Sequence, residues 1–366
     1  MMPGEVTLIQ LGLWVLVAVL ALGLIYVAVT FRLHPVFLVP LAAGALFANI
    51  PIPNLTASLA PFFLTLQSGL TSGLYPALIF LGWGAGANLT YLIAHPRLLV
   101  LGLLTPIAFF PVLFLGYGLG LPPSQAGSAA LVGGGDGLAA TFLAAKIAPE
   151  LTGPVVLAAF TLTGLYFLLQ PYLVDLLVSK QERMLRLPPS RKVSRRESLL
   201  FAAGGLVLTL ILAPWAALLT GMYFLGNILK EAGVADRLAR TLANRLADIL
   251  AVLLGLAAGS QCHAALIFSL TFAKIIVLGL AALLLASTVV ILAIRVLNLF
   301  SAPKINPLIG AAALGLIPDA AQMVQIMGRR EDPHNNLFYH ALACSQAALL
   351  ASTLTAGLLW SILGGR

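Results

Sequence analysis

Long apolar stretches, separated by short polar breaks, cover most of this chain of 366 residues. A helix needs roughly 20 mostly apolar residues to cross the hydrocarbon core of a bilayer. The pattern therefore predicts an all-α integral membrane protein with about nine to eleven helices that cross the bilayer fully or partly. The predicted runs are residues 8–29, 74–92, 98–121, 155–178, 199–215, 249–294 with a break near 259–263, and 337–363.

Two segments between these runs are interrupted by glycine and proline. Residues 126–145 contain three consecutive glycines followed by Asp136, and residues 304–325 contain Asn306-Pro307 and Gly310. Irregular backbone at membrane depth is tolerated only where it is buried in protein or lines a water-filled cavity. We therefore expect both segments to form re-entrant hairpins rather than simple crossings.

A short repeated motif relates the two halves of the chain. Residues 73–82 and 221–226 both carry a Gly-x-Tyr group followed by Phe-Leu-Gly, and in each half an interrupted segment and a closing span come later. Paired interrupted segments in corresponding positions indicate a transport site built from inverted repeats. The predicted organisation is a first membrane repeat at 1–178 with a hairpin around Asp136, a basic loop at 179–197, and a second repeat at 198–366 with a hairpin around Asn306.

Composition and charge narrow the function. The chain is 60% hydrophobic and 9% charged, whereas a soluble domain is about a quarter charged. Much of the net charge of +8 lies in residues 180–197, which hold seven Lys or Arg and two Glu. The positive-inside rule makes this run a cytoplasmic loop, placed to touch anionic lipid. It lacks the neighbouring aromatic or base-reading residues of a nucleic-acid face, so we expect no nucleic-acid partner.

Asp136 is the strongest candidate for chemistry. It is the only charged residue between Arg97 and Lys146. A carboxylate near the bilayer centre costs roughly 2.5 to 3.5 kcal/mol, and intramembrane acids usually mark ion or proton pathways. The flanking glycines allow backbone groups to line a small polar cavity. The alternative is a protonated acid that is hydrogen-bonded to a neighbouring helix.

Asn306 has two interpretations of equal weight. Asparagine followed by proline is a good start for a helix, with the amide as N-cap. An amide oxygen is also a suitable ligand for a hard cation such as Na⁺, by the oxygen-ligand logic that applies to Ca²⁺ and Mg²⁺.

These motifs together resemble a known family. Residues 133–137 (GGGDG) are similar to the GGADG core of the membrane-embedded beta subunit of sodium-pumping, biotin-dependent decarboxylases, which act on oxaloacetate, methylmalonyl-CoA or glutaconyl-CoA. Residues 304–310 (KINPLIG) look identical to that family's second hairpin motif. The resemblance covers nearly the whole chain. Supporting segments are 49–51, 80–82, 170–171, 226–227, 231–234 and 340–341.

The resemblance implies an elevator-like arrangement in which the two hairpins meet near the bilayer midplane. Na⁺ would be bound by Asp136 and Asn306, with Gly310 allowing close approach of the backbone. Asp136 would be the catalytic residue, exchanging Na⁺ for a proton, because a nearby cation favours the carboxylate and desolvation without one favours the acid.

The same resemblance implies partners and a location. Carboxybiotin would be supplied by a carboxyltransferase and biotin-carrier subunit, with no biotin bound covalently to this chain. A small membrane subunit would complete the complex. The chain would be a multi-pass protein of the cell inner membrane and would form a homo-oligomer, a trimer by resemblance.

Several positions depart from the family pattern. Gly315 and Gln322 stand where the family's second hairpin has a serine and an arginine, and Ser345 stands near an amide position of the last span. Asp319 is an added acid that either shifts the site toward cations or caps a helix that starts after Pro318. The residues of possible accessory function are Ser345, Asp319, Gln322 and His340.

These departures keep two other functions open. One is a stand-alone, ion-coupled secondary transporter on the same scaffold, without coupling to a decarboxylase. The other is a non-catalytic assembly subunit, in which Asp136 would be replaceable by alanine without effect.

Overall fold

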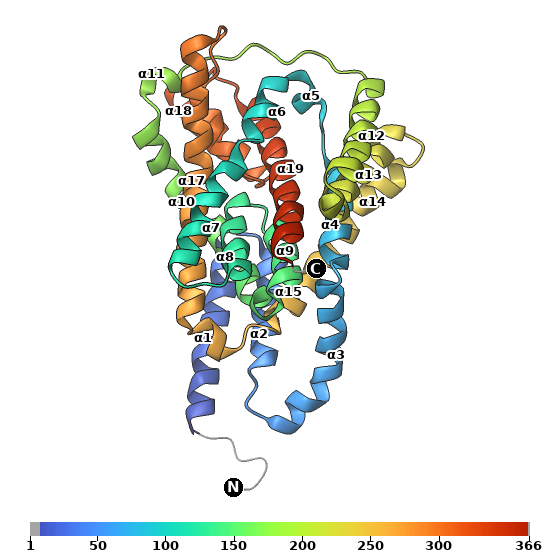
Figure 1. Ribbon diagram of the computed structural model, residues 1–366, viewed down its shortest axis with the longest axis vertical. Coiled ribbons are helices and arrows are strands. Elements are labelled where there is room, and N and C mark those ends of the chain that lie inside the picture. Colours follow the sequence, from blue (N-terminus) through green and yellow to red (C-terminus); the bar gives the residue numbers. More distant parts are fainter. Residues whose placement is uncertain (1–7, 365–366) are drawn as a thin grey trace.

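The computed structural model describes residues 8–364, and within them the secondary structure is helical with no strand (Figure 1). Six helical segments of this part are long and apolar enough to cross a bilayer. The all-α membrane fold is therefore as predicted. These segments are α1 (Leu8–Thr30), α6 to α7 (Pro96–Gly118), η3 with α10 (Pro149–Leu177), α14 to α15 (Asp236–Gly259), α17 (Leu270–Phe300) and α19 (Phe338–Leu363).

The full crossings are fewer than the predicted passes because several apolar runs fold as shorter or bent helices. α3 (Pro53–Thr71) and α4 (Leu74–Gly86) meet at a bend of 56° and make up to one further span. Gly73 forms this bend with a φ of 85°, in the left-handed region that glycine adopts without strain. α2 (Pro35–Ala48) and α9 (Leu138–Ile147) are apolar but too short to cross.

The remaining helices connect these segments. The irregular turns within the long helices are η1 (Thr105–Ala108), between α6 (Pro96–Gly102) and α7 (Phe109–Gly118), and η6 (Leu242–Leu246), between α14 (Asp236–Thr241) and α15 (Ala247–Gly259). η3 (Pro149–Leu151) and α10 (Thr152–Leu177) form one crossing segment together. The connecting helices are α5 (Thr90–Ala94), α11 (Lys180–Arg183), α12 (Arg195–Leu212), η4 (Pro214–Ala216), η5 (Ala217–Gly221), α13 (Met222–Ala232) and α16 (Ala264–Ile267).

The two segments that carry the repeated motif, residues 73–82 and 221–226, pack against each other. α4 carries most of the first motif and α13 most of the second. These two helices lie side by side, next to α12 and α14 (Figure 1). A β-carbon added at Gly84 would collide with the Tyr223 carbonyl, and one added at Gly226 would collide with the Leu81 carbonyl. Small residues allow helix backbones to approach closely in a bilayer, where van der Waals packing drives association.

A second close crossing joins α2 to α15. A β-carbon added at Gly255 would lie 2.7 Å from the Phe37 carbonyl oxygen, and one added at Gly259 would collide with the Leu41 carbonyl. On α2, Gly44 approaches the Leu256 carbonyl in the same way. Both crossings therefore depend on glycine, and each joins a helix of the first half to one of the second.

The two interrupted segments fold as hairpins, as predicted. The first consists of α8 (Pro123–Leu131), the turn η2 (Val132–Gly134) and α9. The second consists of the short helix η7 (Pro307–Ala312), an irregular turn and α18 (Asp319–Glu331). The long helices α10, α17 and α19 pack around both hairpins, so both turns lie inside protein.

The glycines of the α4 and α13 crossing can be tested by adding one methyl group. We expect Gly84→Ala and Gly226→Ala each to destabilise the protein by about 1 to 3 kcal/mol, the usual cost of overpacking a tight contact. Gly204→Ala on α12 is the matched control, because no atom lies within 4 Å of its added β-carbon. Thermal unfolding in detergent measures the effect. Equal unfolding temperatures for all three variants would contradict this packing argument.

Candidate functional site

Asp136 lies at the tip of the first hairpin, in a turn that two glycines make possible. Gly135 has a φ of 76° and Gly137 a φ of 69°, both in the region that disfavours other residues. The sharp turn ends η2 and starts α9, so the Asp136 side chain lies just before the first turn of a helix. Its Oδ1 accepts a hydrogen bond of 2.6 Å from the backbone N–H of Ala139, which satisfies one of the free N–H groups in the first turn of α9.

The other carboxyl oxygen of Asp136 makes no well-formed hydrogen bond. The side chain is only 4% exposed, and Oδ2 is buried. The Ser352 hydroxyl of α19 faces this carboxyl group close to Gly134, and it is also buried without a well-formed hydrogen bond. Buried oxygens with incomplete hydrogen bonding are rare, because each one costs free energy of desolvation. The two groups therefore form a small, oxygen-lined site whose hydrogen bonding is incomplete.

The second hairpin meets the first at Asp136. The backbone N–H of Gly315 donates to the Gly134 carbonyl over 2.7 Å. A β-carbon at Gly315 would lie 2.8 Å from Asp136 Cβ, so a side chain at this position requires the turn to move. Ser345 of α19 holds the same turn by donating to the Leu314 carbonyl. Gly315 and Ser345, two positions that depart from the family pattern, are thus part of the contact between the hairpins.

Hydroxyl and amide groups of α10 and η1 hold the second hairpin. Tyr166 and Gln170 of α10 donate to the Ala311 carbonyl at 2.8 and 3.0 Å. The Tyr166 hydroxyl also lies 2.6 Å from Ser287 Oγ on α17, and Thr105 of η1 donates to the Ala313 carbonyl at 3.1 Å. These bonds fix the peptide groups next to Gly315, so the hairpin turn is held from several sides.

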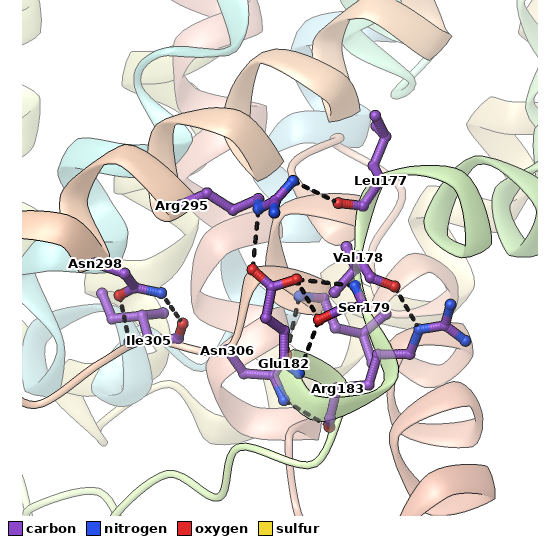
Figure 2. Close-up of polar contacts among 10 residues, drawn as sticks. Leu177, Val178, Ser179, Glu182, Arg183, Arg295, Asn298, Ile305 and Asn306 are labelled. Carbon is purple, nitrogen blue, oxygen red and sulfur yellow. Dashed lines mark hydrogen bonds and ion pairs between the residues drawn. The ribbon is translucent and has the colours of Figure 1, made fainter.

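Asn306 lies under the basic loop and not beside Asp136. Its Oδ1 accepts the N–H of Leu308 at 3.0 Å, so Asn306 is the N-cap of η7. Its Nδ2 donates to the carbonyls of Arg183 and Leu185, each at 2.9 Å. Figure 2 shows Asn306 among the residues of this loop. Of the two interpretations of Asn306, the N-cap is the one that the structure shows, and its amide is occupied by these bonds.

The surrounding contacts tie the basic loop to the hairpin and to α17 (Figure 2). Arg295 of α17 forms an ion pair of 2.9 Å with Glu182 and donates to the Leu177 carbonyl. Arg183 is buried and pairs with Asp175 and Glu331 at 2.6 and 3.1 Å. The first part of the predicted loop is therefore an ordered element, α11, that is bound to the base of the second hairpin.

The other candidate residues lie apart from Asp136. Gly310 packs against the backbone of Ile291 in α17, where a β-carbon would lie 2.6 Å from the Ile291 nitrogen. Asp319 is exposed in the first turn of α18, where a negative charge favours the helix. The helix starts after Pro318 as expected, but its N-cap is Pro318 and Asp319 makes no side-chain cap bond. Gln322 is exposed on the same helix. His340 is buried at the start of α19, close to the basic loop.

Sequence reasoning did not find Ser352, Tyr166, Thr105 or Ser287. Hydroxyl side chains are common in apolar helices, where they bond to the carbonyl one turn earlier, so their presence gives no signal. Ser352 differs because its hydroxyl makes no such bond, and only the packing of α19 against the first hairpin reveals this.

The site suits a small, hard, monovalent cation. Among residues 8–364, no group of three or more His, Cys, Asp or Glu side chains is placed to hold a metal ion. Asp136 offers one carboxylate with neighbouring hydroxyl and backbone oxygens, and oxygen ligands favour hard cations. In the same part of the chain, no Lys or Arg forms an ion pair with Asp136. One positive charge, from a cation or a proton, would balance the carboxylate.

The fold and the site define an all-helical membrane protein in which two hairpins enclose a single carboxylate. The chain belongs to the family of Na⁺-transporting oxaloacetate decarboxylase beta subunits, whose model matches residues 13–363. This confirms the resemblance that the hairpin motifs indicated.

Curated relatives agree with this assignment. The chain is 32% identical to the methylmalonyl-CoA decarboxylase subunit beta of Propionigenium modestum, over 96% of this chain and 95% of that protein. It is 32% identical to the glutaconyl-CoA decarboxylase subunit beta of Acidaminococcus fermentans, over 94% and 91%. It is 36% identical to the oxaloacetate decarboxylase beta chain of Klebsiella pneumoniae, over 79% and 68%.

The role of Ser352 can be tested by removing its hydroxyl. We expect Ser352→Ala to weaken Na⁺ binding about tenfold, which corresponds to the loss of about 1.4 kcal/mol from one oxygen ligand. Calorimetric titration of the purified protein with Na⁺ measures this change. Ser361→Ala is the matched control, because Ser361 lies on the same helix, is exposed, and bonds only to the Leu358 carbonyl. Identical Na⁺ affinities in the two variants would remove Ser352 from the site.

Proposed function

We propose that this chain is the membrane subunit that couples the decarboxylation of carboxybiotin to the export of Na⁺ across the cell inner membrane. The observation that carries the proposal is the meeting of the two hairpins at Asp136, whose buried carboxyl group forms no ion pair with the described residues and makes no well-formed hydrogen bond at Oδ2. Membership of a family of Na⁺-transporting decarboxylase subunits supports the same reading.

Asp136 would exchange Na⁺ for a proton. A buried carboxylate without a counter-charge is strongly unfavourable, and no Lys or Arg in residues 8–364 forms an ion pair with it. The side chain therefore holds either Na⁺ or a proton, and binding of one releases the other. Ser352 would supply a second oxygen in the Na⁺-bound state. This exclusive choice is what a coupled exchange of the two cations requires.

Carboxybiotin supplies a carboxyl group whose release as CO₂ leaves a ring nitrogen that takes up one proton. In our proposal a carboxyltransferase and biotin-carrier subunit delivers this group, and a small membrane subunit completes the complex. The chain would assemble as a homo-oligomer. A proton released when Na⁺ binds Asp136 would match the single proton that decarboxylation consumes.

Movement of the site would follow from the two-repeat organisation, with residues 1–178 and 198–366 as the repeats. The hairpins and the helices α10, α17 and α19 would move together in an elevator-like step against the helices that cross at α4 and α13. Asn306 would connect this moving part to the basic loop at 179–197, since its amide bonds to two carbonyls of that loop.

A second candidate is a stand-alone, ion-coupled transporter on the same scaffold. The uncharged and exposed Gln322 favours it, because the resembled family carries an arginine there. This candidate keeps the exchange at Asp136 but needs no partner subunit, so the two functions differ in what drives Na⁺ movement.

The test is uptake of ²²Na⁺ into proteoliposomes that contain this chain, with and without the candidate partner subunits and their substrate. We expect uptake that requires the partner and the substrate, and its loss by at least about a hundredfold in Asp136→Asn, because the neutral amide removes the cation's counter-charge. Asp248→Asn is the matched control, since Asp248 is exposed, and it is expected to transport at the wild-type rate.

Two outcomes would reject this proposal. Unchanged coupled uptake in Asp136→Asn would remove Asp136 from the mechanism. Uptake by the chain alone, without the partner subunits, would favour the stand-alone transporter.

A further inference from the structure

A pocket of about 240 Å³ lies under the basic loop, separate from Asp136. Its walls come from four parts of the chain: the start of α6, the loop residues Leu187 and Pro188, the Lys304–Ile305 segment that leads into η7, and the start of α19. The pocket is smaller than the roughly 300 to 1,000 Å³ of sites for drug-sized ligands. It would hold one small ring and its substituent.

His340 is the unusual group of this pocket. Its side chain is 6% exposed, lines the pocket, and has no hydrogen-bond partner at either ring nitrogen. The Pro188 carbonyl faces the ring without making a well-formed hydrogen bond. The imidazole of His95 packs against it with ring centroids 4.4 Å apart, and His95 Nε2 is satisfied by Ser190 Oγ at 2.7 Å. A buried polar ring without a partner indicates a place for a ligand's polar atom.

The rim of the pocket is positively charged and its walls are apolar. Arg97 and Lys304 are exposed and line it, and neither forms an ion pair with an acid of the described residues 8–364. No Asp or Glu lines the pocket, while Leu98, Leu187 and Ile305 do. Guanidinium and ammonium groups bind carboxylates, so the pocket suits an anionic group attached to a small ring.

We propose that this pocket binds the carboxylated ring of the biotin that the partner subunit delivers, with Arg97 and Lys304 pairing with its carboxylate and His340 bonding a polar atom of the ring. The inference rests on the proposed function and gives that function a docking site. The pocket's small size selects the ring, and its positive rim selects the carboxylated form over free biotin.

Two elements connect this pocket to the ion site. α19 carries His340 near its start and Ser352 twelve residues later (352 − 340 = 12), a distance of about 18 Å along a helix. Lys304 is followed by Asn306, which caps η7 of the second hairpin. A ligand held by Lys304 and His340 therefore contacts both elements that meet Asp136, which provides a route for coupling.

The test is protection of a cysteine in the pocket from a maleimide reagent, measured on the purified protein in lipid nanodiscs. Leu187→Cys places a thiol in the pocket wall, and the native Cys262 and Cys344 are buried. The probe is the biotinylated carrier domain, chemically carboxylated. When the concentration of the carrier domain is about nine times its Kd, about one pocket in ten is unoccupied, so we expect labelling of the thiol to slow about tenfold. The carrier domain without biotin should give no protection.

Two further variants locate the binding groups, and two more are controls. Adding Arg97→Gln or Lys304→Gln to the Leu187→Cys protein should abolish the protection. Adding Lys192→Gln, which removes one charge from the exposed loop outside the pocket, should leave it unchanged. Val193→Cys, on the same loop but outside the pocket, is the control for the thiol and should be labelled at one rate with or without the carrier.

The outcomes separate this inference from the proposed function. Coupled ²²Na⁺ uptake by wild-type protein, together with no protection of Leu187→Cys, would overturn the docking site alone. Protection without coupled uptake would overturn the proposed function and leave the docking site standing. Protection that persists in both Arg97→Gln and Lys304→Gln would show that neither side chain belongs to the docking site.

Discussion

The buried carboxyl group of Asp136 is the constraint on which the rest of the structure depends. One of its oxygens accepts the Ala139 N–H in the first turn of α9, while the other faces the Ser352 hydroxyl without a well-formed hydrogen bond. In a medium of low dielectric constant, such a group is stable only with a proton or a bound cation. The turns that surround it are built from glycine, so backbone and carboxyl oxygens come close together. The chemistry proposed here follows from the small number of states that this environment permits.

Close backbone contact is the second recurring feature. Gly84 and Gly226 at one crossing, and Gly44 and Gly259 at another, bring helices of the two halves together. Gly315 does the same between the hairpins, where it leaves room only for hydrogen beside Asp136. Because lipid provides no hydrophobic driving force between helices, such packing and a few buried hydrogen bonds are what hold the helices in register.

Polar contacts also connect the site to the basic loop. Asn306 bonds to two loop carbonyls and starts the second hairpin, while Arg295 and Glu182 fix the neighbouring helix α11 (Figure 2). The pocket around His340 lies at the same end of α19. A ligand or partner at the loop would therefore act on elements that reach Asp136 directly, and the fold provides the physical link that coupling needs.

The sequence by itself determined the membrane class and the two interrupted segments, and it marked Asp136 as the candidate for chemistry. Each is a local property: hydrophobic run length, glycine and proline interruptions, and one isolated charge. Only the tertiary structure decided the neighbours of Asp136. It places Ser352 and Gly315 beside the carboxyl group and Asn306 under the basic loop, although sequence alone paired Asn306 with Asp136. Helices that are apolar on all sides carry no periodic signal of which face meets which partner, so these contacts depend on packing.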